Sequence, residues 1–117
     1  MYVQGFVIPV AEGRMEDYRK MAAEAGEWFR EYGAIEVVEC AEADIVDGKT
    51  TDFRMAVKAQ PGEKIVFSWM IWPDRATCDA AAAKMQEDER FKMPDDMPFD
   101  GKRMIFGGFD PIYTLGR

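Results

Sequence analysis

Apolar side chains recur every three or four residues in two parts of the chain. Between residues 14 and 32 they form one stripe with acidic residues in its first turn, where the helix dipole favours negative charge. Gly33 follows this stripe directly and predicts a left-handed C-terminal cap. A second helix is predicted from about residue 75 to residue 90, with Asp74 as its N-cap. Its buried side is expected to hold Cys78, Ala81, Ala82 and Met85.

Four other stretches are rich in β-branched and aromatic residues, which is typical of strands. They are residues 2–10, 35–43, 63–72 and 102–109. In the third, positions 65, 67, 69 and 71 are all large and apolar, and only Ser68 interrupts the other face. A strand that is apolar on both faces is expected to be covered on both.

The connections between these stretches carry clear turn signals. Asp47-Gly48 and Pro61-Gly62 bracket residues 51–59, which are expected to form a short helix or an irregular excursion. We expect this segment to be an ordered flap, because Phe53, Met55 and Val57 need apolar surroundings. Residues 111–115 are predicted to form a terminal extension that pairs with a sheet edge.

The order β-α-β-β-α-β predicts a single α+β domain over residues 1–117 with a ferredoxin-like fold, a four-stranded antiparallel sheet with two helices on one face. No helix is available for the other face, although residues 63–72 and 102–109 are apolar there. We therefore expect a homodimer that packs sheet against sheet, a dimeric α/β barrel. The alternative is that the flap and the C-terminal residues cover the sheet within one chain.

Charge and composition exclude several classes of partner. The net charge is −7, with 15 basic residues against 22 acidic ones, which argues against binding to nucleic acid or to an anionic membrane surface. RNA-recognition domains share the predicted element order, but the third strand here lacks their basic-glycine-aromatic signature. No apolar run approaches the roughly 20 residues that span a bilayer, so we expect a cytoplasmic protein.

The chain contains no histidine and two isolated cysteines. The absence of histidine removes the usual serine and cysteine triads and histidine-ligated haem, so any catalysis must use carboxylates, Lys, Tyr, Cys, an organic cofactor or the reactivity of the substrate. Cys40 and Cys78 are expected to be small buried side chains in a reducing compartment, since two cysteines without histidine cannot complete a zinc site. We predict neither a metal nor a cofactor.

Four segments together resemble the YbaA-like family of uncharacterised bacterial proteins: Asp47-Gly48-Lys49, Thr51-Asp52-Phe53, Val66-Phe67-Ser68-Trp69, and the run from Pro98 to Phe109. The resemblance covers almost the whole chain and implies a dimeric α/β barrel. The wider superfamily includes cofactor-free monooxygenases, haem-degrading enzymes, chlorite-dismutase-like haem proteins and ligand-binding regulators. The haem-binding members rely on a histidine, which this chain lacks.

Eight residues are candidates for lining a ligand cavity: Gln4, Tyr32, Ser68, Trp69, Asp100, Arg103, Gly107 and Gly108. We expect the Ser68 hydroxyl to bond to backbone, because a serine nucleophile needs a base. Gly107 and Gly108 are expected to permit a bulge or the close approach of a partner, a helix or a ligand.

The polar residues before the last strand allow two interpretations. Asp100 is expected to shape a turn with Gly101, and the alternative is a carboxylate at the mouth of a cavity, paired with Arg103. Arg103 is expected to begin the strand and to need either solvent or a carboxylate. The alternative is that Lys102 and Arg103 bind an anion.

Two functions of different classes follow from these observations. The favoured one is a homodimer that binds a small apolar or aromatic molecule. If this protein is an enzyme, we expect it to oxidise that molecule without a cofactor, as a cofactor-free monooxygenase does. The alternative is a non-catalytic homodimeric interaction or stress-related protein. The sequence names no catalytic residue.

Overall fold

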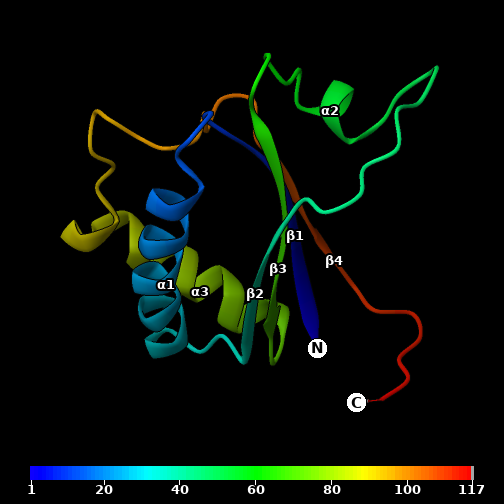
Figure 1. The fold of residues 1–117 in the computed structure, drawn as a ribbon. Helices are drawn as coiled ribbons and strands as arrows, with labels where there is room; N and C mark the ends of the chain where they lie inside the picture. The colour runs from blue at the N-terminus through cyan, green and yellow to red at the C-terminus, as the bar shows by residue number, and fades with distance from the viewer. Residues whose placement is uncertain (117) are drawn as a thin grey trace.

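The computed structural model describes residues 1–116, and its strands form one antiparallel sheet in the order β2-β3-β1-β4. This arrangement confirms the predicted ferredoxin-like α+β fold, with the two long helices on one face of the sheet (Figure 1). The elements in chain order are β1 (Tyr2–Val10), α1 (Met15–Glu31), β2 (Glu36–Ala41), α2 (Phe53–Ala56), β3 (Lys64–Trp72), α3 (Arg75–Glu87), the 3-10 helix η1 (Glu89–Phe91) and β4 (Ile105–Phe109).

The caps predicted for the two long helices are present. Gly33 has a φ of 111° after α1, and its N–H donates to the carbonyl of Arg30. The N–H of Ala34 donates to the carbonyl of Phe29, which completes a Schellman motif. At the start of α3 the Asp74 carboxylate accepts a hydrogen bond from the Thr77 N–H at 2.7 Å.

The second long helix is shorter than predicted. α3 ends at Glu87, and the chain continues as η1, whose first turn is capped by the Asp88 side chain. Cys78 and Ala81 are buried as expected, but Ala82 is exposed. Consecutive helical positions differ by about 100° in direction, so Ala81 and Ala82 cannot both face the sheet at this crossing.

Strand register separates the sheet into two faces of different character. Phe6 lies opposite Ser68 and Phe106 on the face that carries α1 and α3, and Val7 lies opposite Phe67 and Ile105 on the other face. The helix-covered face holds the core, which includes Ile8, Val10, Tyr18, Val66, Trp72 and Ala81. The other face, hereafter the open face, keeps large apolar side chains in solvent: Phe67, Ile105 and Phe109.

The flap lies on the open side of the sheet, away from α1 and α3 (Figure 1). Its α2 begins at an Asp52 cap that accepts from the Met55 N–H at 2.7 Å. Val57 is fully buried, whereas Phe53 and Met55 stay nearly half exposed. Phe53 meets Phe67 edge to face with the ring centroids 6.2 Å apart. The flap is therefore ordered and covers one end of the open face, as the short-helix alternative predicted.

Two expectations for the C-terminal part are wrong. β4 begins at Ile105 and not at residue 102, because residues 100–103 form a turn in which the Arg103 and Met104 N–H groups both donate to the Asp100 carbonyl. Residues 110–116 form no strand and pair with no edge of this chain. Their three large apolar side chains are almost fully exposed: Ile112, Tyr113 and Leu115. They therefore do not cover the open face.

Candidate functional site

An apolar cavity of about 190 Å³ lies between α1, the helix-covered face of the sheet and the segment that follows α3. Strands β1 and β3 contribute Phe6, Ile8 and Met70 to its wall, while the lining from α1 includes Met21 and Phe29. The segment after α3 contributes Phe91 and further apolar side chains up to Phe99. Rings and methionine side chains therefore make up most of the lining.

One end of the cavity is polar and consists of Tyr18, Glu39 and Ser68. The Tyr18 hydroxyl, on α1, donates to the Glu39 carboxylate at 2.6 Å. Glu39 lies on β2 directly opposite Ser68 on β3, and the Ser68 hydroxyl is the second side chain that hydrogen-bonds to this carboxylate. Tyr18 and Ser68 are buried, whereas Glu39 retains solvent exposure along the edge strand.

Burial shifts the pKa of the two titratable residues of this group, Tyr18 and Glu39. Desolvation raises the pKa of Glu39 above its usual value, and the hydrogen bonds from Tyr18 and Ser68 lower it in partial compensation. Desolvation also raises the pKa of Tyr18, and the neighbouring Glu39 charge adds to this effect. The tyrosine therefore stays a hydrogen-bond donor, and Glu39 is an acceptor that takes up a proton more readily than an ordinary glutamate.

Glu39 also borders a second hollow. A groove of about 580 Å³ runs between α1 and the outer edge of β2, and small residues of α1 line it together with Ile35 and Val37. The groove explains why Glu39 is exposed although its carboxylate bonds to two buried hydroxyls. The carboxylate therefore borders both hollows, the apolar one beneath the segment that follows α3 and the outer groove beside β2.

Of this group of three, only Ser68 was among the residues predicted from the sequence. The hydroxyl has a carboxylate partner where we expected backbone. Glu39 shares a strand face with Ile35 and Val37 in the predicted alternation, so a lone acid on an apolar face was an available signal. Tyr18 carried no such signal, because it sits within the apolar stripe of its helix.

Two other candidates have partners within the chain and do not line this cavity. The Gln4 side-chain oxygen accepts from the Trp72 indole N–H at 2.9 Å. The Tyr32 hydroxyl donates to the Asp88 carboxylate at 2.6 Å, which joins the end of α1 to the end of α3. Both contacts stabilise the packing of elements against one another.

Three candidates lie on β3 and β4. Trp69 and Gly107 belong to the open face, and the Trp69 indole N–H donates to Glu36 at 2.9 Å. Gly108 faces the other way, where a Cβ would lie 1.7 Å from the Tyr2 hydroxyl oxygen. The group that lies close to Gly108 is thus Tyr2 of β1, and not a partner, a helix or a ligand as expected. That Trp69 and Gly107 line a cavity shared with a second copy stays a prediction.

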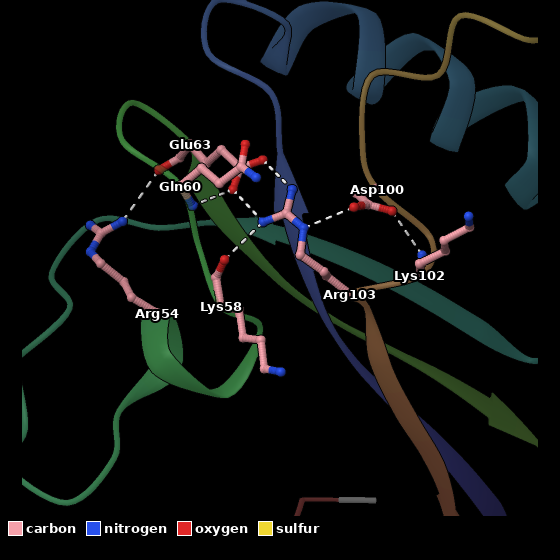
Figure 2. Close-up of polar contacts among 7 residues, drawn as sticks. All are labelled: Arg54, Lys58, Gln60, Glu63, Asp100, Lys102 and Arg103. Carbon is pink, nitrogen blue, oxygen red and sulfur yellow. Dashed lines mark hydrogen bonds and ion pairs between the residues drawn. The ribbon is translucent and has the colours of Figure 1, made fainter.

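The last two candidates, Asp100 and Arg103, belong to a polar network beneath the flap (Figure 2). Arg103 donates to Asp100 at 2.8 Å, to both oxygens of Glu63 at 2.7 Å and to the Lys58 carbonyl at 3.0 Å. Asp100 also accepts from the Lys102 N–H at 2.9 Å, which is the expected turn. Asp100 therefore shapes the turn and pairs with Arg103 at the same time.

This network joins three separate parts of the chain. Arg54 of α2 pairs with Glu42 and donates to the Glu63 carbonyl, so it approaches the start of β3 from the side opposite to Arg103 (Figure 2). The Arg103 cation holds the pKa of Glu63 and of Asp100 below their usual values. Four hydrogen bonds engage the guanidinium, so the arrangement fastens the flap to the sheet and does not favour Arg103 as an anion-binding group.

Residues 1–101 match the family described as "Protein of unknown function (DUF1428)". The uncharacterized protein YbaA of Escherichia coli K12 is 53% identical over 112 residues, which cover 95% of this chain and 96% of that protein. YbaA of Shigella flexneri matches to the same extent. The chain belongs to this family.

The family description and the relatives' names state no activity, so we infer the function of this DUF1428 member from its own residues. Within residues 1–116, no three or more Cys, Asp and Glu side chains are grouped so that they could hold a metal ion. None of the helices described in this part of the chain is long and apolar enough to cross a membrane.

Proposed function

We propose that this protein is a homodimer that binds a small apolar or aromatic molecule in the cavity beside Tyr18, Glu39 and Ser68. One observation supports this most strongly: the apolar cavity ends at a carboxylate that two buried hydroxyls orient. Ligand sites in proteins are typically apolar hollows with a few placed polar groups. An apolar cavity of about 150 Å³ is large enough for benzene, so about 190 Å³ suits a molecule with one ring.

The second copy is supported by the apolar surface of the open face. Phe67, Ile105 and Phe109 are exposed there, and the flap adds Phe53 and Met55. Ile112, Tyr113 and Leu115, which follow β4 in the chain, are exposed as well. A monomer rarely leaves a continuous apolar patch of this kind in solvent.

Native mass spectrometry of protein freshly purified from its source cells tests both parts of the proposal. We expect a dimer that carries additional mass. The matched variants are Ala22→Phe, which fills the cavity from α1, and Ala23→Phe, whose position lines the outer groove and not the cavity. The additional mass should be lost in the first variant and kept in the second. Additional mass that both variants keep would contradict the location of the site.

Cofactor-independent oxidation of the bound molecule is the catalytic form of this proposal. Glu39 favours it, because a carboxylate of raised pKa beside an apolar cavity is suited to accept a proton from a substrate. Oxygen consumption on addition of a hydroquinone, lost in Glu39→Gln, would support catalysis. An empty dimer without such activity would favour the non-catalytic interaction role.

A further inference from the structure

The polar end of the cavity has no free side-chain donor. A tyrosine or serine hydroxyl carries a single proton, and both Tyr18 and Ser68 direct that proton to Glu39. The methionine sulfurs of the lining are weak acceptors. Lys92 lies at the rim, where its ammonium pairs with Glu89 at 3.1 Å and is mostly exposed. The side chains at the polar end can therefore only accept further hydrogen bonds, through the lone pairs of their oxygen atoms.

This arrangement selects among ligands by their hydrogen-bonding groups. A bound donor can share the Glu39 carboxylate with Tyr18 and Ser68, because an ionised carboxylate has about four acceptor sites. A ligand that carries only an acceptor leaves its own polar atom unpaired next to three oxygen atoms, which costs binding free energy. A carboxylate ligand would in addition bring a second negative charge beside Glu39.

The size and lining of the cavity restrict the rest of the molecule. Its volume of about 190 Å³ admits one ring with a small substituent. Phe6, Phe29, Phe91 and Phe99 face it together with several methionines, and both side-chain types pack favourably against aromatic rings. A neutral hydroxyl enters such a cavity with a smaller desolvation cost than an ammonium ion does.

We propose that the ligand is a single-ring phenol whose hydroxyl donates to Glu39, with Tyr18 and Ser68 as the residues that position the carboxylate. This inference rests on the proposed function, since it names the class of molecule that the same cavity takes. The ring lies among the phenylalanines and methionines, and the hydroxyl points to the junction of α1, β2 and β3.

Binding of four para-substituted toluenes to the whole protein, measured by ligand-observed NMR and calorimetry, tests the inference. They are 4-methylphenol as donor, 4-methylanisole as acceptor, 4-methylbenzoate as anion and p-xylene without a polar atom. We expect 4-methylphenol to bind about tenfold more tightly than 4-methylanisole, as the loss of one hydrogen bond to a charged group predicts. We expect no detectable binding of 4-methylbenzoate.

The variant Glu39→Met should reverse the order of affinity between the phenol and the anisole. A cavity that selects ligands only by their apolar surface would not show this reversal. It removes the acceptor and frees the Tyr18 and Ser68 hydroxyls to donate, so 4-methylanisole should now bind at least as tightly as 4-methylphenol. Glu39→Gln, which keeps an acceptor oxygen without charge, should reduce the preference for the phenol without reversing it. If Glu39→Met does not fold, the wild-type series and Glu39→Gln decide the question.

The possible failures are distinguishable. If none of the four molecules binds, the proposed function itself is wrong. If p-xylene and 4-methylanisole bind as tightly as 4-methylphenol, the cavity binds apolar molecules but the donor requirement is wrong. 4-Methylbenzylamine is measured in the same way as a cationic donor, and tighter binding of this amine than of 4-methylphenol would overturn the assignment to phenols.

Discussion

Arg103 and Glu63 form a two-pronged ion pair, with both contacts at 2.7 Å, between the turn before β4 and the turn before β3. Their side chains are 19% and 10% exposed, so the pair is largely shielded from water. The same guanidinium binds Asp100 and the Lys58 carbonyl. One side chain thus connects the flap, the start of β3 and the turn before β4.

Replacement of Arg103 should destabilise the protein. Arg103→Gln removes the cation and leaves Glu63 shielded and unpaired, and we expect the free energy of unfolding to fall by about 2 kcal/mol at pH 7. Urea denaturation measures this change. Arg30→Gln is the control, because Arg30 pairs with Glu27 on the exposed surface of α1 and should have an effect within error. Equal losses in the two variants would contradict the role of the network.

The stabilisation by Arg103 should disappear in acid. The pKa of Glu63 is lowered in the folded protein from 4.5 and that of Asp100 from 3.8, so the unfolded chain binds these protons more tightly. The stability that these two ionised carboxylates contribute is therefore fully present above their unfolded-state pKa values. It is lost as the pH falls through their folded-state pKa values. The difference in unfolding free energy between wild type and Arg103→Gln should stay constant from pH 7 to about pH 5.5. It should shrink below pH 4.5, and a difference that persists unchanged at pH 3 would contradict this cause.

Glu39 should show the opposite dependence on pH. Its pKa is raised in the folded protein above 4.5, mainly by desolvation, so the folded state binds this proton more tightly than the unfolded state. Protonated Glu39 therefore stabilises the folded protein below pH 4.5, and this stabilisation is lost as the pH rises through the folded-state pKa of Glu39. Glu39→Gln keeps an acceptor for Tyr18 and does not ionise. Its stability relative to wild type should therefore be higher at pH 7 than at pH 4 in the same denaturation assay, and the reverse trend would show that desolvation is not the dominant cause.

The two glycines of β4 should differ in their tolerance of alanine. A Cβ on Gly108 would lie 1.7 Å from the Tyr2 hydroxyl oxygen, while one on Gly107 would lie 3.4 Å from the Phe109 ring. Gly108→Ala must displace the Tyr2 side chain and should cost about 1–2 kcal/mol of unfolding free energy. Gly107→Ala should be close to neutral. In a Tyr2→Ala background the cost of Gly108→Ala should vanish, and a cost that remains would point to the backbone instead.

The proposed homodimer can be tested by placing a charge on the open face. Phe67 is 45% exposed on β3, and Phe67→Asp would place a charge in the proposed interface. We expect light scattering after size exclusion to show a dimer for wild type and a monomer for this variant. Ile35→Asp is the control, since Ile35 is 62% exposed but lies just before β2, where it lines the groove beside α1 on the helix side of the sheet. Dissociation by both variants, or by neither, would contradict packing through the open face.

What the sequence determined by itself is local. β1 has the predicted limits, the Gly33 and Asp74 caps are where their residue types indicated, and the faces of β3 follow from simple alternation. Periodicity and capping depend on residues a few positions apart, so a single segment contains the information. The predicted start of β4 and the predicted burial of Ala82 were wrong, because the turn at residues 100–104 and the packing of α3 on the sheet decide them.

What only the tertiary structure decided is the pairing of distant residues. Tyr18 meets Glu39 across 21 positions, and Arg103 meets Glu63 across 40. Tyr2 lies over Gly108 through the register of β1 with β4. Ser68 was recognisable as the lone polar residue on its strand face, but its partner was not. Such contacts arise only when strand order and register are set. The alternation of polar and apolar residues assigns each strand its two faces, but it does not say which strand lies beside it or which residue of that strand lies opposite.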